Sequence, residues 1–123
     1  MKTLLLFRGT CGSGKTTLRK NIMTLAFMPG LDMADKPYDM PLDDRVEYPA
    51  RWIHKNAKTM DLWMEGIFAW DSPSLTALLH ECRQQKRVVQ MITTSTTTDT
   101  LRKRLKGQPE RLRLALKYAN RFN

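Results

Sequence analysis

Residues 9–16 read Gly9-Thr10-Cys11-Gly12-Ser13-Gly14-Lys15-Thr16, which matches the phosphate-binding loop pattern G-x-x-x-x-G-K-[ST] in full. A short apolar run at residues 4–7 comes directly before this loop, and helix-compatible residues follow it to about residue 28. Such a strand–loop–helix setting is what the pattern requires in order to bind a nucleotide triphosphate. The stretch therefore predicts both an α/β fold and a triphosphate site.

The chemistry of the loop follows from its glycines and from the helix behind it. Glycine adopts backbone angles that are closed to other residues, so successive N–H groups can turn inward around an anion. The helix adds its positive N-terminal end. We expect Lys15 to reach the β and γ phosphates of ATP, and the Thr16 hydroxyl to ligate Mg²⁺. The predicted nucleotide-contacting residues are Gly9, Thr10, Cys11, Gly12, Ser13, Gly14, Lys15, Thr16 and Thr17.

The composition indicates one ordinary domain over residues 1–123, since 41% of the side chains are hydrophobic and can form a core. No apolar stretch approaches the ~20 residues that span a bilayer. The apolar run after Lys2 is too short for a signal peptide because Arg8 interrupts it. Two cysteines, one of them in the phosphate loop, do not make a disulfide framework. We therefore expect a cytoplasmic protein with reduced thiols.

Apolar runs and helical spacing alternate along the chain. We expect strands at residues 3–7, 61–66 and 87–92, and helices at 14–28, 50–58, from 73 onward, 99–106 and 109–121. This order predicts a three-layer α/β fold, with a parallel sheet flanked by helices and the ligand at the carboxyl ends of the strands. The acidic, proline-containing stretch 31–48 is expected to be mostly loop. Either a further strand lies within it, with 36–42 as the candidate, or the sheet is a minimal version with a missing strand.

A second part of a triphosphate site is a carboxylate at the end of a neighbouring strand, which helps to hold the magnesium ion. Glu65 fits this role because it follows an apolar run and precedes Gly66, where a ligand can approach closely. Asp61 lies at the other end of that predicted strand, and Asp71 is a weaker alternative. We predict Thr16 and Glu65 as the metal residues, although a surface carboxylate at a strand end would have the same pattern.

The early phosphate loop, Glu65-Gly66 on a later strand and an Arg-rich helix downstream together resemble the small P-loop kinases, among them nucleoside, nucleotide, shikimate, gluconate and polynucleotide 5′-kinases. The resemblance covers most of the chain as an order of elements, but only residues 9–16 are a specific motif. The chain departs from the family in one respect. After residues 109–121 we expect neither the last strand nor the adenine-contacting loop that such kinases usually carry.

The resemblance implies further site residues. In this family an Asp after the first helix contacts the acceptor hydroxyl, and Asp32 and Asp35 stand in the matching region, with Asp35 slightly preferred. A solvated acidic loop is an equal alternative. The family also has a lid whose arginines clamp the transferring phosphoryl group, and residues 102–111 look like that lid, with Arg104 and Arg111 as the candidates. The resemblance thus implies a catalytic set of Lys15, Asp35, Arg104 and Arg111.

Charge is distributed unevenly along the chain. Residues 101–123 contain eight Lys or Arg and one acid, Glu110, and so carry +7 of the total +9, whereas residues 32–47 contain six acids. The basic segment favours a polyanionic acceptor. Two alternatives remain: oppositely charged segments that face each other across a cleft, or a solvated helix face.

These observations favour an ATP- and Mg²⁺-dependent phosphotransferase that acts on a nucleotide or a nucleic-acid 5′ end. One alternative is a nucleic-acid-associated or regulatory NTPase without a dedicated acceptor, and another is a kinase-like fold that works through protein contacts. Phe68 and Trp70, just beyond Glu65, could stack on a base, but core packing is the favoured interpretation for both.

Overall fold

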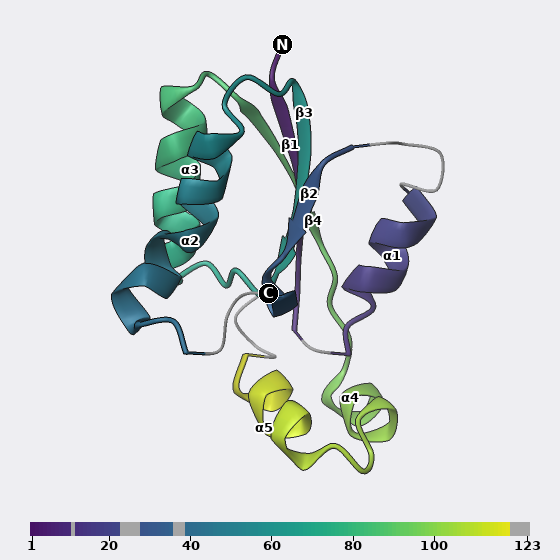
Figure 1. The fold of residues 1–123 in the computed structure, drawn as a ribbon. Helices are drawn as coiled ribbons and strands as arrows, with labels where there is room; N and C mark the ends of the chain where they lie inside the picture. Colours follow the sequence, from purple (N-terminus) through teal and green to yellow (C-terminus); the bar gives the residue numbers. More distant parts are fainter. Residues whose placement is uncertain (11, 23–27, 36–38, 119–123) are drawn as a thin grey trace.

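Four parallel strands form the centre of the protein, as the computed structural model shows for the residues that it describes, 1–10, 12–22, 28–35 and 39–118. Their order in the sheet is β2-β3-β1-β4. The strands are β1 (Thr3–Arg8), β2 (Gly30–Asp32), β3 (Asp61–Gly66) and β4 (Val88–Thr93). β1 pairs with β3 on one side and with β4 on the other, so the phosphate loop that follows β1 leaves from the middle of the sheet (Figure 1).

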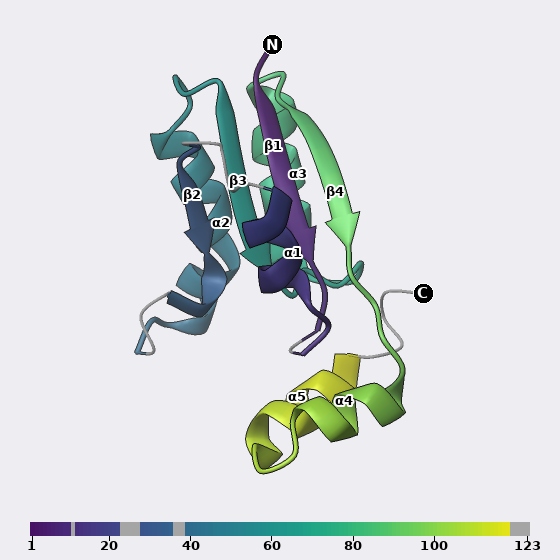
Figure 2. The same cartoon turned by 90° about the vertical axis from the view of Figure 1, so that its right-hand side faces the viewer.

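Helices cover both faces of this sheet and its carboxyl edge. Figures 1 and 2 show α1 on one face, α2 and α3 together on the other, and α4 and α5 beyond the strand ends. The helices are α1 (Lys15–Ile22), α2 (Leu42–Lys55), α3 (Pro73–Gln84), α4 (Thr98–Arg104) and α5 (Pro109–Tyr118), and a 3₁₀ helix, η1 (Met33–Asp35), follows β2. This confirms the predicted three-layer α/β fold. None of the described helices has the length and apolarity to cross a membrane.

The alternation of side chains along the strands decides what each face of the sheet carries. Leu4 and Leu6 of β1 and Leu62 and Met64 of β3 are fully buried and belong to the main core, to which α2 and α3 contribute Ile53, Leu75, Leu78 and Cys82. Because neighbouring residues of a strand point to opposite faces, Trp63 and Glu65 point toward α1. The apolar face therefore stabilises the fold, while the α1 face carries the polar residues near the phosphate loop.

The stretch 31–48 differs from the sequence prediction in two ways. The fourth strand is β2 (Gly30–Asp32), not residues 36–42: residues 36–38 lie outside the described part, and 39–41 are not in a strand. In addition, α2 begins at Leu42 rather than near residue 50, and it contains Pro49. A proline inside a helix removes one backbone hydrogen bond, but Pro49 is buried together with Ala50 and Ile53, and α2 packs closely along α3. Burial therefore outweighs the lost hydrogen bond.

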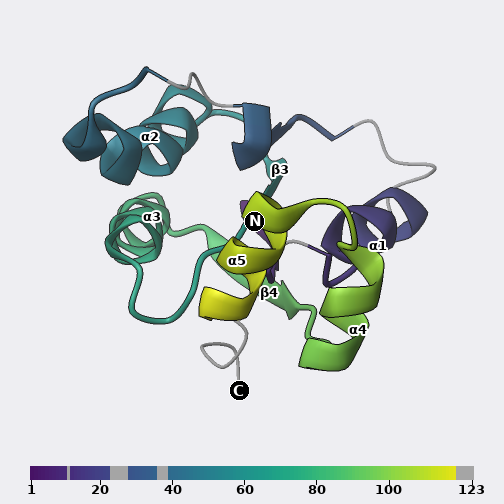
Figure 3. The same ribbon diagram turned by 90° about the horizontal axis from the view of Figure 1, so that it is seen from below.

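The helices α4 and α5 form a hairpin with its own small core of Leu101, Leu105 and Ala115, against which Leu112 packs. The Thr97 side chain caps α4 by accepting a 3.1 Å hydrogen bond from the Thr100 N–H. Gly107, between the helices, has a φ of +83°, which glycine adopts without strain. Both predicted helices are present over their described residues, although α4 ends at Arg104 rather than at residue 106. Figure 3, from below, shows α4 next to α1 and α5 crossing beneath the sheet, so the hairpin lies at the edge where the strands end.

Candidate functional site

The phosphate loop connects β1 to α1 in a tight turn. Gly12 and Gly14 have φ values of +77° and +94°, angles that residues with a Cβ rarely adopt. Ser13 braces the loop: its Oγ donates to the Thr10 carbonyl at 2.7 Å and lies 2.6 Å from Thr94 Oγ1. Thr94 follows β4 and its backbone N–H bonds to the end of β1. The loop is therefore attached to two neighbouring strands.

The lysine of the loop is held close to the loop itself. Lys15 begins α1, and its Nζ donates to the Thr10 carbonyl at 3.2 Å. Thr16 follows it in the first turn, and Thr17 is exposed. Cys11, which was also predicted to contact the nucleotide, lies outside the described residues. The ammonium group and the Thr16 hydroxyl thus stand at the N-terminal end of α1, where an anion is favoured.

Glu65, the residue before the last in β3, is in direct contact with this end of α1. Glu65 is only 2% exposed. Thr16 Oγ1 donates to Glu65 Oε2 at 2.6 Å, and Arg19 Nε donates to Glu65 Oε1 at 2.7 Å. Asp61, at the other end of β3, accepts a 2.6 Å hydrogen bond from Thr3 Oγ1 on the exposed surface, as its position in the strand predicts. The structure therefore brings Thr16 and Glu65 together and keeps Asp61 away.

The two candidate acceptor aspartates are placed differently. Asp32 ends β2, pairs in register with Glu65 and lines the pocket described below, whereas Asp35 is exposed in η1 and is not among the residues that line it. Asp32 Oδ1 accepts from the Ala34 N–H at 3.0 Å, and Oδ2 lies 4.0 Å from Arg19 Nη2. The slight preference for Asp35 thus does not agree with the geometry, because the end of β2 already stands at the site.

The surroundings of Asp32 also change its acidity. Burial raises the pKa of the Asp32 carboxyl, and the negative charges of Glu65 and Asp35 raise it further. The Ala34 N–H and the Arg19 guanidinium oppose this effect without cancelling it. Asp32 is therefore a stronger base than an ordinary surface aspartate.

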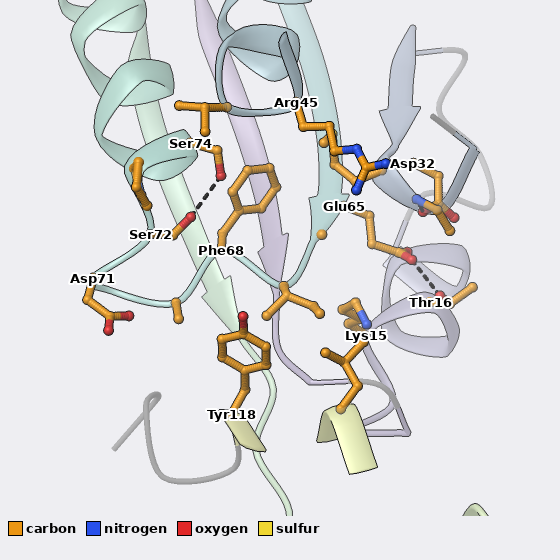
Figure 4. A pocket seen from close by; sticks show the side chains of 18 of the residues that line it. Lys15, Thr16, Asp32, Arg45, Glu65, Phe68, Asp71, Ser72, Ser74 and Tyr118 are labelled. Atoms are coloured by element: carbon orange, nitrogen blue, oxygen red, sulfur yellow. Dashed lines mark hydrogen bonds between the residues drawn. The ribbon is translucent and has the colours of Figure 1, made fainter. Parts of the chain in front are cut away.

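A pocket of about 750 Å³ extends from the phosphate loop along the carboxyl edge of the sheet. Its polar end carries Lys15, Thr16, Asp32 and Glu65, and Figure 4 shows Arg45 of α2 reaching toward Asp32 and Glu65. Ser72, Ser74 and Asp71 lie at the opposite end from Thr16, so Asp71 is poorly placed for a metal at Thr16. Much of the wall between is apolar: Met33, Leu42, Val46, Ile67, Phe68, Ala69 and Leu114.

The two predicted lid arginines come from the α4–α5 hairpin. Arg104 Nη1 donates to the Gly12 carbonyl at 2.8 Å, which attaches α4 to the phosphate loop. Arg111 lines the pocket, and its Nη1 donates to Gln108 Oε1 at 2.7 Å. One arginine therefore touches the phosphate loop and the other touches the pocket.

Sequence reasoning missed the role of Arg8, which it treated only as a charge that interrupts an apolar run. Arg8 is 1% exposed, and its Nη1 donates to the Phe68 carbonyl while its Nε donates to Thr93 Oγ1, both at 2.9 Å. Burial lowers the pKa of its guanidinium. Phe68 has a φ of +44°, unusual for a non-glycine residue. Arg8 therefore holds in place the loop that supplies one wall of the pocket.

Phe68 and Trp70 were both expected to pack in the core. Phe68 does so, and it also lines the pocket. Trp70 does not pack in the core, since it is 58% exposed. Its ring stacks on Arg8, with 3.8 Å between the guanidinium carbon and the ring centre. This cation–π contact with Arg8 gives the exposed Trp70 ring a partner at the strand end, and it depends on tertiary packing rather than on a local signal in the sequence.

The donors at the loop fit a magnesium ion that arrives with a nucleotide. In the part of the chain that the structure describes, no three His, Cys, Asp or Glu side chains converge as a metal centre. Mg²⁺ commonly uses one or two protein oxygens together with substrate phosphates. The Thr16 hydroxyl and the Glu65 carboxylate, 2.6 Å apart, are such oxygens.

No protein-family model and no curated protein matches the chain. Among solved structures, it is similar to a gluconokinase from Sinorhizobium meliloti 1021, with a TM-score of 0.66 and 15% sequence identity. The similarity covers 94% of this chain and 73% of that chain. At this identity the likeness concerns the fold, and the chain has a P-loop kinase-like α/β fold.

Proposed function

We propose that the protein is a Mg²⁺-dependent phosphotransferase, which moves the γ-phosphoryl group of ATP to a nucleotide or to the 5′ end of a nucleic acid. One observation carries the proposal: the phosphate loop opens on a pocket of about 750 Å³ that also contains a partly buried carboxylate, Asp32. Ligand pockets for small molecules have about this size. An NTPase needs room only for a water molecule beside the phosphates, so the size of the pocket is better explained by a second substrate.

The donor end consists of the loop and the start of α1. Lys15 would exchange its bond with the Thr10 carbonyl for the β and γ phosphate oxygens. Thr16 and Glu65 would hold Mg²⁺, which, when bound, offsets the negative charge of the phosphates. Arg104, already at the Gly12 carbonyl, and Arg111 would bind the equatorial oxygens of the transferring group. These cations act on charge that the reaction spreads over the phosphoryl group.

Asp32 would act on the acceptor. As the acceptor oxygen forms its bond to the γ-phosphorus, the bond from that phosphorus to the β–γ bridging oxygen breaks and ADP leaves. When the acceptor is a hydroxyl, its proton moves to an Asp32 carboxylate oxygen. The raised pKa of Asp32 favours this transfer, because a general base works best when its pKa lies nearer the working pH.

The walls of the pocket favour a nucleotide or nucleic-acid acceptor. Apolar side chains such as Phe68 and Val46 suit the flat face of a base, while Arg45 on α2 suits a phosphate group of the acceptor. The similar gluconokinase suggests a sugar acid as the competing acceptor. A polyol requires hydrogen-bond partners around its hydroxyls, and the apolar stretch of this wall does not supply them.

The test is an acceptor panel with γ-labelled ATP and Mg²⁺. Nucleosides, nucleoside monophosphates, oligonucleotides with a 5′-hydroxyl and gluconate are each incubated with the protein, and phosphate release is followed in parallel. We expect label on a nucleotide or an oligonucleotide, and no label with Lys15→Ala. Label on gluconate alone, or phosphate release unaffected by any acceptor, would contradict the proposal.

A further inference from the structure

Arg19 contacts both carboxylates at the reaction end of the pocket. It lies on α1 one helical turn after Lys15. Its Nε donates to Glu65 Oε1 at 2.7 Å, and its Nη2 lies 4.0 Å from Asp32 Oδ2. The other oxygen of Glu65 accepts from Thr16 at 2.6 Å. Both oxygens of Glu65 are therefore engaged by the protein, one by a hydroxyl and one by a cation.

The guanidinium of Arg19 is held in this position from behind. It stacks on the Trp63 ring, with 4.2 Å between the guanidinium carbon and the ring centre. Trp63 is fixed in turn, because its Nε1 donates to the Met28 carbonyl at 2.9 Å and its ring covers Gly30, where a Cβ would overlap it. The Arg19 side chain is only 14% exposed. Arg19 is thus preorganised rather than drawn to the carboxylates by chance.

The carboxylate pair of Asp32 and Glu65 would otherwise attract divalent cations. The two residues are register partners at the ends of adjacent parallel strands, and their side chains are only 23% and 3% exposed. Two carboxylates and the Thr16 hydroxyl are the hard oxygen ligands that Mg²⁺ and Mn²⁺ prefer. Lys15 and Arg45 line the same pocket; Lys15 Nζ donates to the Thr10 carbonyl and Arg45 Nε to the Met40 carbonyl.

We propose that Arg19 is a positioning residue that serves as the resident counter-ion of the carboxylate pair. It holds Glu65 toward Thr16 and offsets one of the two negative charges of the pair, so the protein binds a divalent cation well only when a nucleotide brings further phosphate oxygens. This inference rests on the metal role proposed for Thr16 and Glu65. It adds that Arg19, on the helix that follows the phosphate loop, makes binding of the divalent cation depend on the nucleotide.

The test is direct Mn²⁺ binding to the nucleotide-free protein, followed by calorimetry or by the paramagnetic resonance signal of free Mn²⁺. We expect Arg19→Met to bind Mn²⁺ at least roughly tenfold more tightly than the wild type, because a unit charge 2.7 Å from Glu65 and 4.0 Å from Asp32 is removed. Arg19→Lys, which keeps the charge, should stay near the wild type. Lys20→Met removes an exposed charge from the same helix and should leave Mn²⁺ binding unchanged.

A second measurement needs no change at Arg19. If Arg19 satisfies Glu65, then Glu65→Gln should bind Mn²⁺ as weakly as the wild type without nucleotide, and more weakly than the wild type with ATP present. Equal Mn²⁺ affinity for folded Arg19→Met and wild type would overturn the inference. A loss of nucleotide-free affinity in Glu65→Gln would also overturn it. Neither measurement requires phosphoryl transfer, so a failure of the proposed reaction would be seen separately in the acceptor panel.

Discussion

The hydroxyl of Thr16 donates a 2.6 Å hydrogen bond to Oε2 of Glu65, which joins the first turn of α1 to the carboxyl end of β3. Residues 49 positions apart in the sequence therefore form one oxygen-rich corner beside the phosphate loop. A nucleotide-bound Mg²⁺ would take the Thr16 hydroxyl as a ligand and leave Glu65 to orient the ligands around it.

This arrangement predicts the effect of Glu65→Gln. The amide keeps the shape of the side chain and can accept a hydrogen bond from Thr16, but it removes the negative charge. We expect turnover to fall by about 10- to 100-fold, the usual cost of changing a group that orients metal ligands, and ATP affinity to change much less. Steady-state kinetics and calorimetry measure the two quantities. Asp61→Asn, at the exposed end of β3, is the matched control, and wild-type turnover in Glu65→Gln would refute the metal role of Glu65.

Lys15→Ala tests the donor end of the site. The Lys15 side chain bonds to the Thr10 carbonyl within the loop and supports no distant element, so stability should change by no more than about 1 kcal/mol. A charge-assisted bond to phosphate contributes more, and we expect ATP affinity to fall by roughly 10- to 100-fold, with loss of turnover. Calorimetry on the folded variant decides this, and unchanged affinity would refute the assignment of the loop.

The parts of the site that were predictable from the sequence are those with short-range signals. Residues 9–16 depend on glycines whose positive φ values the pattern itself implies, and β1, β3 and β4 follow from continuous apolar runs. Glu65 was predictable because a strand and a glycine frame it. These features need no knowledge of which strands are neighbours.

The remaining parts depend on tertiary contacts. β2 has three residues, too few for a periodic signal, and its pairing with β3 is what selects Asp32 over Asp35 at the pocket. α2 continues through Pro49 because it packs against α3, and the position of a proline in the sequence cannot show this packing. The roles of Arg8 and Arg19 were not predicted from the sequence, and the packing of Trp70 and Trp63 against them shows these roles in the structure.

Asp32→Asn should separate activity from stability. With a hydroxyl acceptor, loss of a general base should lower turnover by about 10²- to 10⁴-fold. The folded-state pKa of Asp32 is raised above the ordinary 3.8, so at neutral pH its ionised form destabilises the folded state, and this penalty disappears as the pH falls through the raised pKa. We therefore expect Asp32→Asn to raise the Tm at pH 7 and to lose that advantage in acid.

The same shift sets the pH dependence of the wild type. Asp32 acts as a base only when ionised, so turnover should decline in acid at a pH above the range of an ordinary aspartate, about 3.9. Asp35→Asn, three residues away and exposed, is the control. Turnover at pH 7 should stay near the wild type, and the decline in acid should move only slightly to lower pH, because the Asp35 charge raises the pKa of Asp32 less than burial does. A large loss of turnover in Asp35→Asn, with normal turnover in Asp32→Asn, would restore the assignment that the sequence slightly favoured.

Arg104 and Arg111 should act on the transferring phosphoryl group. Each is expected to bind charge that grows in the transition state, so alanine at either position should lower kcat by about 10- to 1,000-fold, with a smaller change in KM. Arg104→Ala also removes the bond to the Gly12 carbonyl, whereas Arg104→Lys retains a cation there. Partial recovery of kcat in Arg104→Lys would support an electrostatic role, and an equal loss in both variants would indicate that α4 only braces the loop.

The outer face of α5 should matter only for a polyanionic acceptor. Arg113 and Lys117 are exposed, and the Arg113–Glu110 ion pair, at 2.9 Å, joins two side chains more than 80% exposed, so it contributes little to stability. If a nucleic-acid backbone runs along this face from the pocket, Arg113→Ala with Lys117→Ala should weaken oligonucleotide binding similarly for all sequences. The slope of log K against log salt should then flatten by about 0.7 per lost contact. Mononucleotide kinetics should not change, because neither side chain lines the pocket.

Lys55→Ala with Lys58→Ala removes two exposed charges around the end of α2 and is the control. An unchanged slope for the α5 pair would leave the basic segment as a solvated surface and favour a mononucleotide as the acceptor.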